Sequence, residues 1–283
     1  MRNSEKENTP DLWIEHLPFP KQDGNKYDRG HAIIGGGGIA STGAAKIVAR
    51  CALRSGAGLV SVACDAESLP IYAASFQAIM TKPVANVQEF AKLIDDKRVT
   101  AISLGSGAGI TEKTKEFVLA ALAKNKSVVI DADALSVFAD NPHLLFSAIK
   151  SPCILTPHEG EFKRLFGTLI DDGDSREIRA QRAAQMSGAV VILKGFNTVI
   201  AAPDGRTTIN YNATPYLASA GTGDALAGIC VGLLAQNMPA FEAACAGVWL
   251  HAEAASRFGV GLIAEDIAEL LPEILRELTD YKS

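Results

Sequence analysis

The segment SAGTGDALAG, residues 219–228, places a carboxylate among small residues at the predicted start of an apolar helix. The backbone N–H groups of Gly221, Thr222 and Gly223 would be free there, and the two glycines have no Cβ to block a ligand. Free N–H groups and the helix dipole both favour an anion, so this helix start could hold phosphate oxygens.

Asp224 follows these residues directly. A carboxylate beside phosphate is unfavourable unless it has a function, such as accepting a proton from a hydroxyl that attacks phosphorus. An acidic residue in the first helical turn is also favoured by the helix dipole alone. The flanking glycines favour the catalytic interpretation.

A lysine and a histidine follow two other apolar segments. Lys194 ends a predicted strand in LKGFNTVI, where its ammonium group could reach phosphate and Gly195 would let the backbone approach. A lone lysine at a strand end is more commonly a surface residue. His158 lies in the turn of LTPHEGEFKRLFG, at the carboxyl end of a strand, where ligands bind in open α/β sheets. Taken alone, it is more simply a hydrogen-bonded loop histidine.

The segments LGSGAG, residues 104–109, and DADAL, residues 131–135, also follow predicted strands. The glycines of the first would let substrate or phosphate approach the backbone. Asp131 and Asp133 could hold Mg²⁺ through water, although for Asp133 we favour a cap on a helix that begins at Ala134. No second His or Cys stands at ligand spacing from His158, which argues against zinc.

The segment HAIIGGGGIASTGAA contains the spacing of a dinucleotide-binding turn at Gly35, Gly37 and Ala40. A dehydrogenase would also need a ribose-binding acid and a second half that transfers hydride. Asp65 ends the next predicted strand, but it lies farther from Gly35 than the usual ~20 residues, and no second half is visible. The turn therefore predicts close packing or an anion at a helix start, and not hydride transfer.

Strands and helices alternate from residue 31, which predicts a mostly parallel sheet covered on both faces. NTVIAAP and RTTIN flank an Asp-Gly turn, which predicts a hairpin at the sheet edge. Residues 1–10 are expected to be a mobile tail, and Trp13 and Leu17 to pack onto the body from a short helix. We expect one domain over residues 1–283, with no linker inside it. The predicted strands are HAIIG, LVSVAC, TAISLG, SVVIDAD and PCILT.

The composition narrows the class of protein. The 283 residues have a formal net charge of -5 and no basic stripe, which argues against a nucleic-acid partner. The five cysteines are scattered without a C-x-x-C motif, which fits a reducing cytosol. The polar N-terminus is no signal peptide, and no run of about 18 apolar residues predicts a membrane span. We expect a cytoplasmic protein.

Taken in order, these segments resemble the ADP/ATP-dependent NAD(P)H-hydrate dehydratases, a family of ribokinase-like fold. The matching segments include STGAAKIVARCALRSGAGLVSVA, LTPHEGEF, LKGFNTVIAAPDGR and LASAGTGDALAGICVGLLAQ, and the match runs from about residue 26 to 272. The family usually has Pro where this chain has Ser106, and the glycine run at 35–38 is longer than usual. The epimerase domain fused ahead of many members is expected to be absent, since only residues 1–25, the tail and short helix, precede the match.

The resemblance implies a three-layer α/β/α fold and a metabolite-repair reaction. The S-form of hydrated NADH or NADPH would be dehydrated at the expense of ADP, with release of AMP and phosphate; eukaryotic members use ATP. Mg²⁺ and a homo-oligomer, often a tetramer, are implied as well. Asp224 would be the base, and the N–H groups of 221–223 would stabilise the transferring phosphoryl group. By resemblance, the substrate-binding residues are Ala44, Gly107, His158 and Asp224, and the nucleotide-binding residues are Lys194, Gly195, Phe196, Asn197, Thr198 and Gly223.

Two other functions remain open at this point. A small-molecule kinase of the same fold, acting on a thiazole or pyrimidine alcohol, would use the same Asp224 and glycines but release a stable phosphorylated product. The LTPHEGEF and LKG-x-x-T segments argue against it. A nucleotide sensor without turnover would gain little from the carboxylate.

Overall fold

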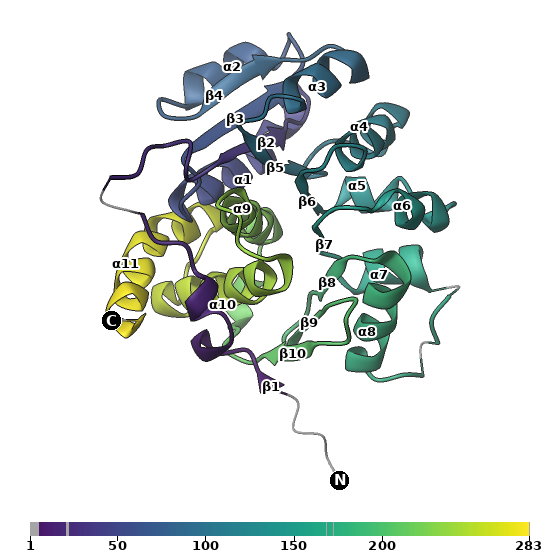
Figure 1. The fold of residues 1–283 in the computed structure, drawn as a ribbon, viewed down its shortest axis with the longest axis vertical. Coiled ribbons are helices and arrows are strands. Elements are labelled where there is room, and N and C mark those ends of the chain that lie inside the picture. The colour runs from purple at the N-terminus through teal and green to yellow at the C-terminus, as the bar shows by residue number, and fades with distance from the viewer. Residues whose placement is uncertain (1–5, 21–22, 168, 172, 283) are drawn as a thin grey trace.

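The computed structural model describes residues 6–20, 23–167, 169–171 and 173–282, in which ten strands form one sheet with helices on both faces (Figure 1). The strand order is β1-β10-β9-β8-β7-β6-β5-β2-β3-β4. All neighbouring strands are parallel except the β8–β9 and β9–β10 pairs, as expected for a parallel sheet with an added hairpin. The strands are β1 (Lys6–Glu7), β2 (His31–Gly35), β3 (Leu59–Cys64), β4 (Met80–Pro83), β5 (Val99–Leu104), β6 (Ser127–Ile130), β7 (Cys153–Leu155), β8 (Val190–Leu193), β9 (Thr198–Ala201) and β10 (Thr207–Asn210).

The helices form two layers (Figure 1). Helices α1, α9, α10 and α11 cover one face of the sheet, and α3 to α8 cover the other. Side chains alternate along β2 accordingly: Ala32 and Ile34 join the first apolar core, and Ile33 joins the second. The helices are α1 (Thr42–Arg54), α2 (Leu69–Ser75), α3 (Val87–Ile94), α4 (Glu112–Leu122), α5 (Asp133–Ser136), α6 (Pro142–Ala148), α7 (Glu159–Phe166), α8 (Arg176–Ser187), α9 (Thr222–Ala235), α10 (Ala240–Phe258) and α11 (Ala264–Lys282).

The N-terminal segment differs from the expected mobile tail. Residues 1–5 lie outside the described residues, but Lys6–Glu7 form strand β1, parallel to β10. The predicted hairpin is confirmed, since β9 and β10 pair antiparallel. It is not the outermost element of the sheet, because β1 lies beyond β10. The Asn8 amide donates to Asn210 Oδ1 at 3.0 Å and to the Cys245 carbonyl at 2.8 Å, which fixes this segment. Sequence patterning missed β1 because two residues are too few to show alternation.

The segment around Trp13 packs as expected, although its helical form is different. Trp13 and Leu17 are buried, but they follow two short 3₁₀ turns, Pro10–Leu12 and Ile14–His16, and not an α-helix. Elsewhere, sequence reasoning did not predict α2 or β4. In the described part of the chain, no helix is long and apolar enough to cross a membrane.

Helix α9 lies closely against α1 because Gly228 and Gly232 have no side chain. A Cβ on Gly228 would lie 2.5 Å from the Val48 carbonyl oxygen, and one on Gly232 would lie 2.5 Å from that of Ala52. These backbone contacts cannot yield without separating the two helices. The close approach fixes the helix whose first turn contains Asp224.

We therefore predict that Gly228→Ala destabilises the fold by about 1–3 kcal/mol, the usual cost of overpacking. Equilibrium urea unfolding would measure the change. Gly43→Ala is the matched control, since a Cβ on Gly43, also in a helix, would meet nothing within 4 Å. Equal stability of the two variants would contradict this account of the helix pair.

Candidate active site

The first turn of α9 is a candidate anion site, called the anion site below. Gly221 precedes the helix with φ of 86°, and no side chain caps the helix start. Within the described residues, the N–H groups of Gly221, Thr222 and Gly223 have no hydrogen-bond partner. The Thr222 hydroxyl donates to the carbonyls of Leu217 and Ser219, at 2.8 and 3.0 Å, and so holds the preceding loop. This arrangement leaves the three N–H groups available to a ligand.

Asp224 is partly buried in the same turn. Burial raises the pKa of its carboxyl group, and the charges of Asp131 and Asp133 raise it further, whereas Ser106 and Lys194 oppose the shift. A raised pKa makes a carboxylate a better proton acceptor. The raised pKa gives Asp224 a proton affinity that suits a general base.

Lys194 extends from the end of β8 toward the start of α9. Its Nζ atom lies 3.5 Å from the place that a Cβ on Gly223 would occupy. It is also 2.9 Å from Asp131 Oδ1 and 3.7 Å from Glu161 Oε2. Burial lowers the pKa of Lys194, but these carboxylates outweigh burial and raise it, so the ammonium group stays charged. Lys194 is thus a partly buried cation, fixed beside the anion site by two carboxylates, and not a surface lysine.

Both aspartates proposed as possible magnesium ligands have other partners. Asp131 Oδ1 accepts from the Thr156 hydroxyl at 2.5 Å as well as from Lys194. The expected capping role of Asp133 is wrong: α5 begins at Asp133 itself, and its N-cap, Ala132, has no side-chain cap. Asp133 Oδ2 instead accepts from the Gly109 N–H at 2.8 Å, because the loop after β5 passes beside α5.

His158 has a structural role in addition to its place near the site. It is the N-cap of α7, and its Nδ1 atom accepts from the N–H groups of Gly160 and Glu161, at 2.9 and 3.3 Å. The Glu161 side chain accepts in turn from the His158 N–H at 2.8 Å, which completes a capping box. The backbone of His158 forms a parallel bridge with Lys194, so the two residues are fixed side by side.

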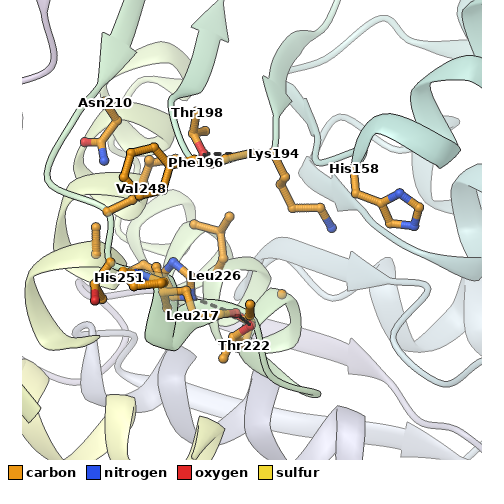
Figure 2. A pocket seen from close by; sticks show the side chains of 17 residues that line it. His158, Lys194, Phe196, Thr198, Asn210, Leu217, Thr222, Leu226, Val248 and His251 are labelled. Atoms are coloured by element: carbon orange, nitrogen blue, oxygen red, sulfur yellow. Dashed lines mark hydrogen bonds between the residues drawn. The ribbon is translucent and has the colours of Figure 1, made fainter. Parts of the chain in front are cut away.

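A cavity of about 370 Å³ lies between Lys194 and α10 (Figure 2). It brings together most of the predicted nucleotide-binding residues, and His158 contributes to the same wall. In Figure 2, Lys194 and His158 lie on one side of the cavity, and Asn210, Val248 and His251 lie on the other. Asn197 is exposed in the turn before β9 and is not among the lining residues. The predicted residues that line the cavity are His158, Lys194, Gly195, Phe196, Thr198, Thr222 and Gly223.

The opposite wall was missed by sequence reasoning. It consists mainly of apolar side chains from α9, α10 and the loop before α9, which sequence alone cannot distinguish from core residues. Such a wall suits the flat, apolar faces of a nucleobase. Its members include Asn210, Pro215, Leu217, Leu226, Val248, His251 and Ala252.

Ala44 and Gly107 meet on the side of the anion site next to α1. A Cβ on Gly107 would lie 3.3 Å from Ala44 Cβ, and the Gly107 carbonyl accepts from the Ser41 hydroxyl at 2.8 Å. The glycine run packs against the same loop, since a Cβ on Gly37 would lie 2.3 Å from the Gly107 oxygen. The structure thus shows close packing at Gly37, one of the two interpretations given to this turn.

His251 connects the cavity to the anion site. Its Nε2 atom lies 2.8 Å from the Thr222 carbonyl oxygen, at the first residue of α9. Burial lowers the pKa of His251 to about 4, despite the opposing hydrogen bond to Thr222. The ring is therefore neutral at pH 7 and donates to that carbonyl through Nε2–H.

This pKa predicts an acid sensitivity. Between pH 6.5 and 4 the unfolded chain protonates His251 and the folded chain does not, so stability falls as the pH is lowered through that window. From pH 7 to pH 5 we expect wild type to lose about 2 kcal/mol more than His251→Gln does. Urea unfolding at the two pH values measures this difference, and equal losses in the two proteins would show that His251 is not the responsible group.

The sheet order, the helix layers and an anion site at a helix start define a ribokinase-like α/β protein with a nucleotide-sized cavity, a fold shared with solved structures. The family model described as NAD(P)H-hydrate dehydratase matches residues 32–275. The chain belongs to the NAD(P)H-hydrate dehydratase family.

Individual relatives agree with this assignment. The chain is 34% identical to an ADP-dependent (S)-NAD(P)H-hydrate dehydratase from Neisseria meningitidis, over 87% of this chain and 85% of that protein. It is 36% identical to the bifunctional NAD(P)H-hydrate repair enzyme Nnr of Salinibacter ruber, over 92% of this chain and 51% of the relative. The chain thus spans about half the length of such bifunctional relatives. An ADP/ATP-dependent NAD(P)H-hydrate dehydratase from Bacillus subtilis, co-crystallized with ATP/Mg²⁺, superposes with a TM-score of 0.86 at 27% identity, over 98% of this chain and 99% of that one.

Proposed function

We propose that this chain is a hydro-lyase that repairs damaged nicotinamide cofactors, acting as a single domain over residues 1–283. Its substrate is the S-form of hydrated NADH or NADPH, and ADP is converted to AMP and phosphate as the reaction proceeds. The observation that carries the proposal is the juxtaposition of Asp224, three unpaired N–H groups and Lys194 at the start of α9. The names of the relatives supply the substrate class.

The geometry supports a sequence of steps in which atoms and charges balance. The Asp224 carboxylate accepts the proton of the substrate 6-hydroxyl, and the hydroxyl oxygen attacks the terminal phosphorus of ADP. The bond from that phosphorus to the bridging oxygen breaks, and AMP leaves. The ring-nitrogen lone pair then expels phosphate from C6 and leaves an N1=C6 iminium, and transfer of the C5 proton to water forms the 5,6 double bond of NADH or NADPH.

The chain's own residues account for the phosphoryl transfer. The N–H groups of residues 221–223 would donate to the transferring phosphoryl oxygens, and the fixed ammonium of Lys194 would neutralise part of their charge. We assign the adenine base to the apolar cavity wall and the phosphates to the end beside Gly223. Phe196, Asn197 and Thr198 would border the nucleotide, whereas Ala44, Gly107 and His158 would contact the hydrated dinucleotide.

Magnesium fits this site as an ion carried by the nucleotide. The described residues contain no group of three or more His, Cys, Asp or Glu side chains that could hold a metal, and Mg²⁺ is commonly bound by one or two carboxylates together with substrate phosphates. Glu161 already accepts from the His158 N–H and lies 3.7 Å from Lys194 Nζ, so it would hold the ion through water. When bound, Mg²⁺ would neutralise charge on the phosphates.

One assay tests the function. The protein is mixed with hydrated NADH and ADP, and the absorbance of reduced nicotinamide is followed together with inorganic phosphate. Both signals should rise in equal amounts. A stable phosphorylated product without phosphate release would indicate a kinase instead, and nucleotide binding without either signal would indicate a sensor. Replacing ADP by ATP in the same assay tests the nucleotide preference.

Two further properties belong to this proposal. We propose a homo-oligomer, a tetramer by resemblance, and the exposed side chains of Ile39, Val260 and Ile263 are apolar surface that a subunit contact would cover. Light scattering tests the assembly. We also propose a cytoplasmic location, supported by five free, buried cysteines.

A further inference from the structure

The hydroxyl of Ser106 is buried and makes no hydrogen bond that stabilises the fold of the described residues. The residue is 3% exposed, and within the described residues its Oγ atom has no hydrogen-bond partner. A buried hydroxyl left unpaired is costly, so native structures normally give it a partner. The Ser106 hydroxyl favours the charged form of the Asp224 carboxyl and so opposes the rise of the pKa of that group.

The loop that contains Ser106 is held on both sides. Gly105 and Gly107 have φ of 124° and 68°, values that a residue with a side chain rarely adopts. The Gly107 carbonyl accepts from Ser41 of the segment before α1, and the Gly109 N–H donates to Asp133 of α5. A Cβ on Gly105 would lie 1.7 Å from the Asp131 carbonyl oxygen, so the loop cannot retreat there. The loop packs on α1, where a Cβ on Gly107 would lie 3.3 Å from Ala44 Cβ, and the residue before α9 packs on the same part of α1, where a Cβ on Gly221 would lie 2.9 Å from Ile47 Cδ1. The Ser106 loop and the start of α9 are thus both fixed against the first turns of α1.

We infer that Ser106 is a positioning residue whose hydroxyl donates to the Asp224 carboxylate and keeps it oriented and ready to accept a proton. This inference rests on the proposed function for its role in turnover, but the pairing itself can be measured without turnover. Donation from a fixed hydroxyl stabilises the charged carboxylate more than the protonated form.

The other groups around Asp224 show why such a donor is needed. Asp131, after β6, and Asp133, on α5, are negative and disfavour the carboxylate. Lys194, after β8, is positive but has Asp131 and Glu161 as closer partners. The Cys51 thiol of α1, which interacts with Asp224, is kept neutral because burial raises its pKa to about 12. Ser106 is thus an uncharged group that favours the ionised form of Asp224.

The test compares Ser106→Ala with wild type by ¹³C NMR of carboxyl-labelled aspartate, and Asp224→Asn identifies the Asp224 signal. We expect the midpoint of that signal to rise by about one pH unit in Ser106→Ala, as for loss of a hydrogen bond to a charged group. The midpoint on the acid side of the pH profile of kcat/KM for the hydrate should rise by the same amount. The value of kcat/KM should therefore fall about tenfold at pH values below this midpoint and change little above it. Ser106→Thr retains a hydroxyl and should return both values toward wild type.

Ser103→Ala is the matched control, because Ser103 is also buried, three residues earlier on β5, and has no place in the site. It should leave both midpoints unchanged. An unmoved Asp224 signal in folded Ser106→Ala would overturn the inference. The wild-type protein could fail to dehydrate the hydrate while the Asp224 midpoint still moves in Ser106→Ala. That result would support the pairing of Ser106 with Asp224 and contradict the proposed reaction.

Discussion

Asp224→Asn is expected to lower kcat for dehydration of hydrated NADH by about 10²–10⁴-fold, the usual contribution of a general base. The amide is nearly the same size as the carboxylate but cannot accept the proton of the substrate hydroxyl. Nucleotide binding should survive, because the unpaired N–H groups and Lys194 are untouched. Stopped assays of phosphate release, with calorimetric titration of ADP, measure the two effects separately.

The control for this substitution is Asp140→Asn, which removes an exposed carboxylate after α5. It should leave kcat and ADP affinity unchanged. If Asp224→Asn kept kcat within tenfold of wild type, another group would have to accept the proton, and the proposed role of α9 in proton transfer would be lost.

The second large effect is expected at Lys194. Lys194→Met removes the cation beside the anion site and leaves Asp131 and Glu161 as buried carboxylates without it. Breaking a buried pair in this way costs about 3–5 kcal/mol of stability. ADP affinity should fall as well, by about tenfold or more, since a charge-assisted contact is lost and two negative groups now face the phosphates.

A double variant separates the loss of stability from the loss of ADP affinity. In Lys194→Met with Asp131→Asn, one unpaired charge is removed, so part of the stability should return while ADP affinity remains low. Lys97→Met, at an exposed lysine after α3, controls for the loss of a positive charge as such. Full recovery of ADP binding in the double variant would mean that Lys194 acts only on the fold and does not contact the nucleotide.

Much of this structure could be predicted from short sequence patterns, because the start of a helix and the extent of a strand depend mainly on residues adjacent in the sequence. The start of α9 could be placed from Gly221 and Gly223 before an apolar run, since a helix needs only its own residues to leave its first N–H groups unpaired. The position of Lys194 followed from the end of an apolar strand. The strands of the parallel sheet were recognisable for the same reason: they are short, β-branched and bounded by Gly, Asp or Pro.

Contacts between distant residues were not predictable in this way. Lys194 and Asp131 are 63 residues apart, and nothing near either residue indicates the other. Asp133 was expected to cap its own helix, whereas its partner is Gly109 on a neighbouring loop. His251 and Val248 lie on a helix that is mostly apolar, so the residues that face the cavity could not be distinguished from those that face the core.

The burial of α9 also bears on how the molecule must move. All residues from Ala225 to Ala235 of this helix are buried, and two of its glycines touch the backbone of α1. A helix that is packed on every side cannot move as a unit toward a ligand that binds. We therefore expect ligands to enter and leave through movement of the surrounding surface segments, such as residues 211–220. The Asp224 carboxyl and the N–H groups at the start of α9 should keep their positions.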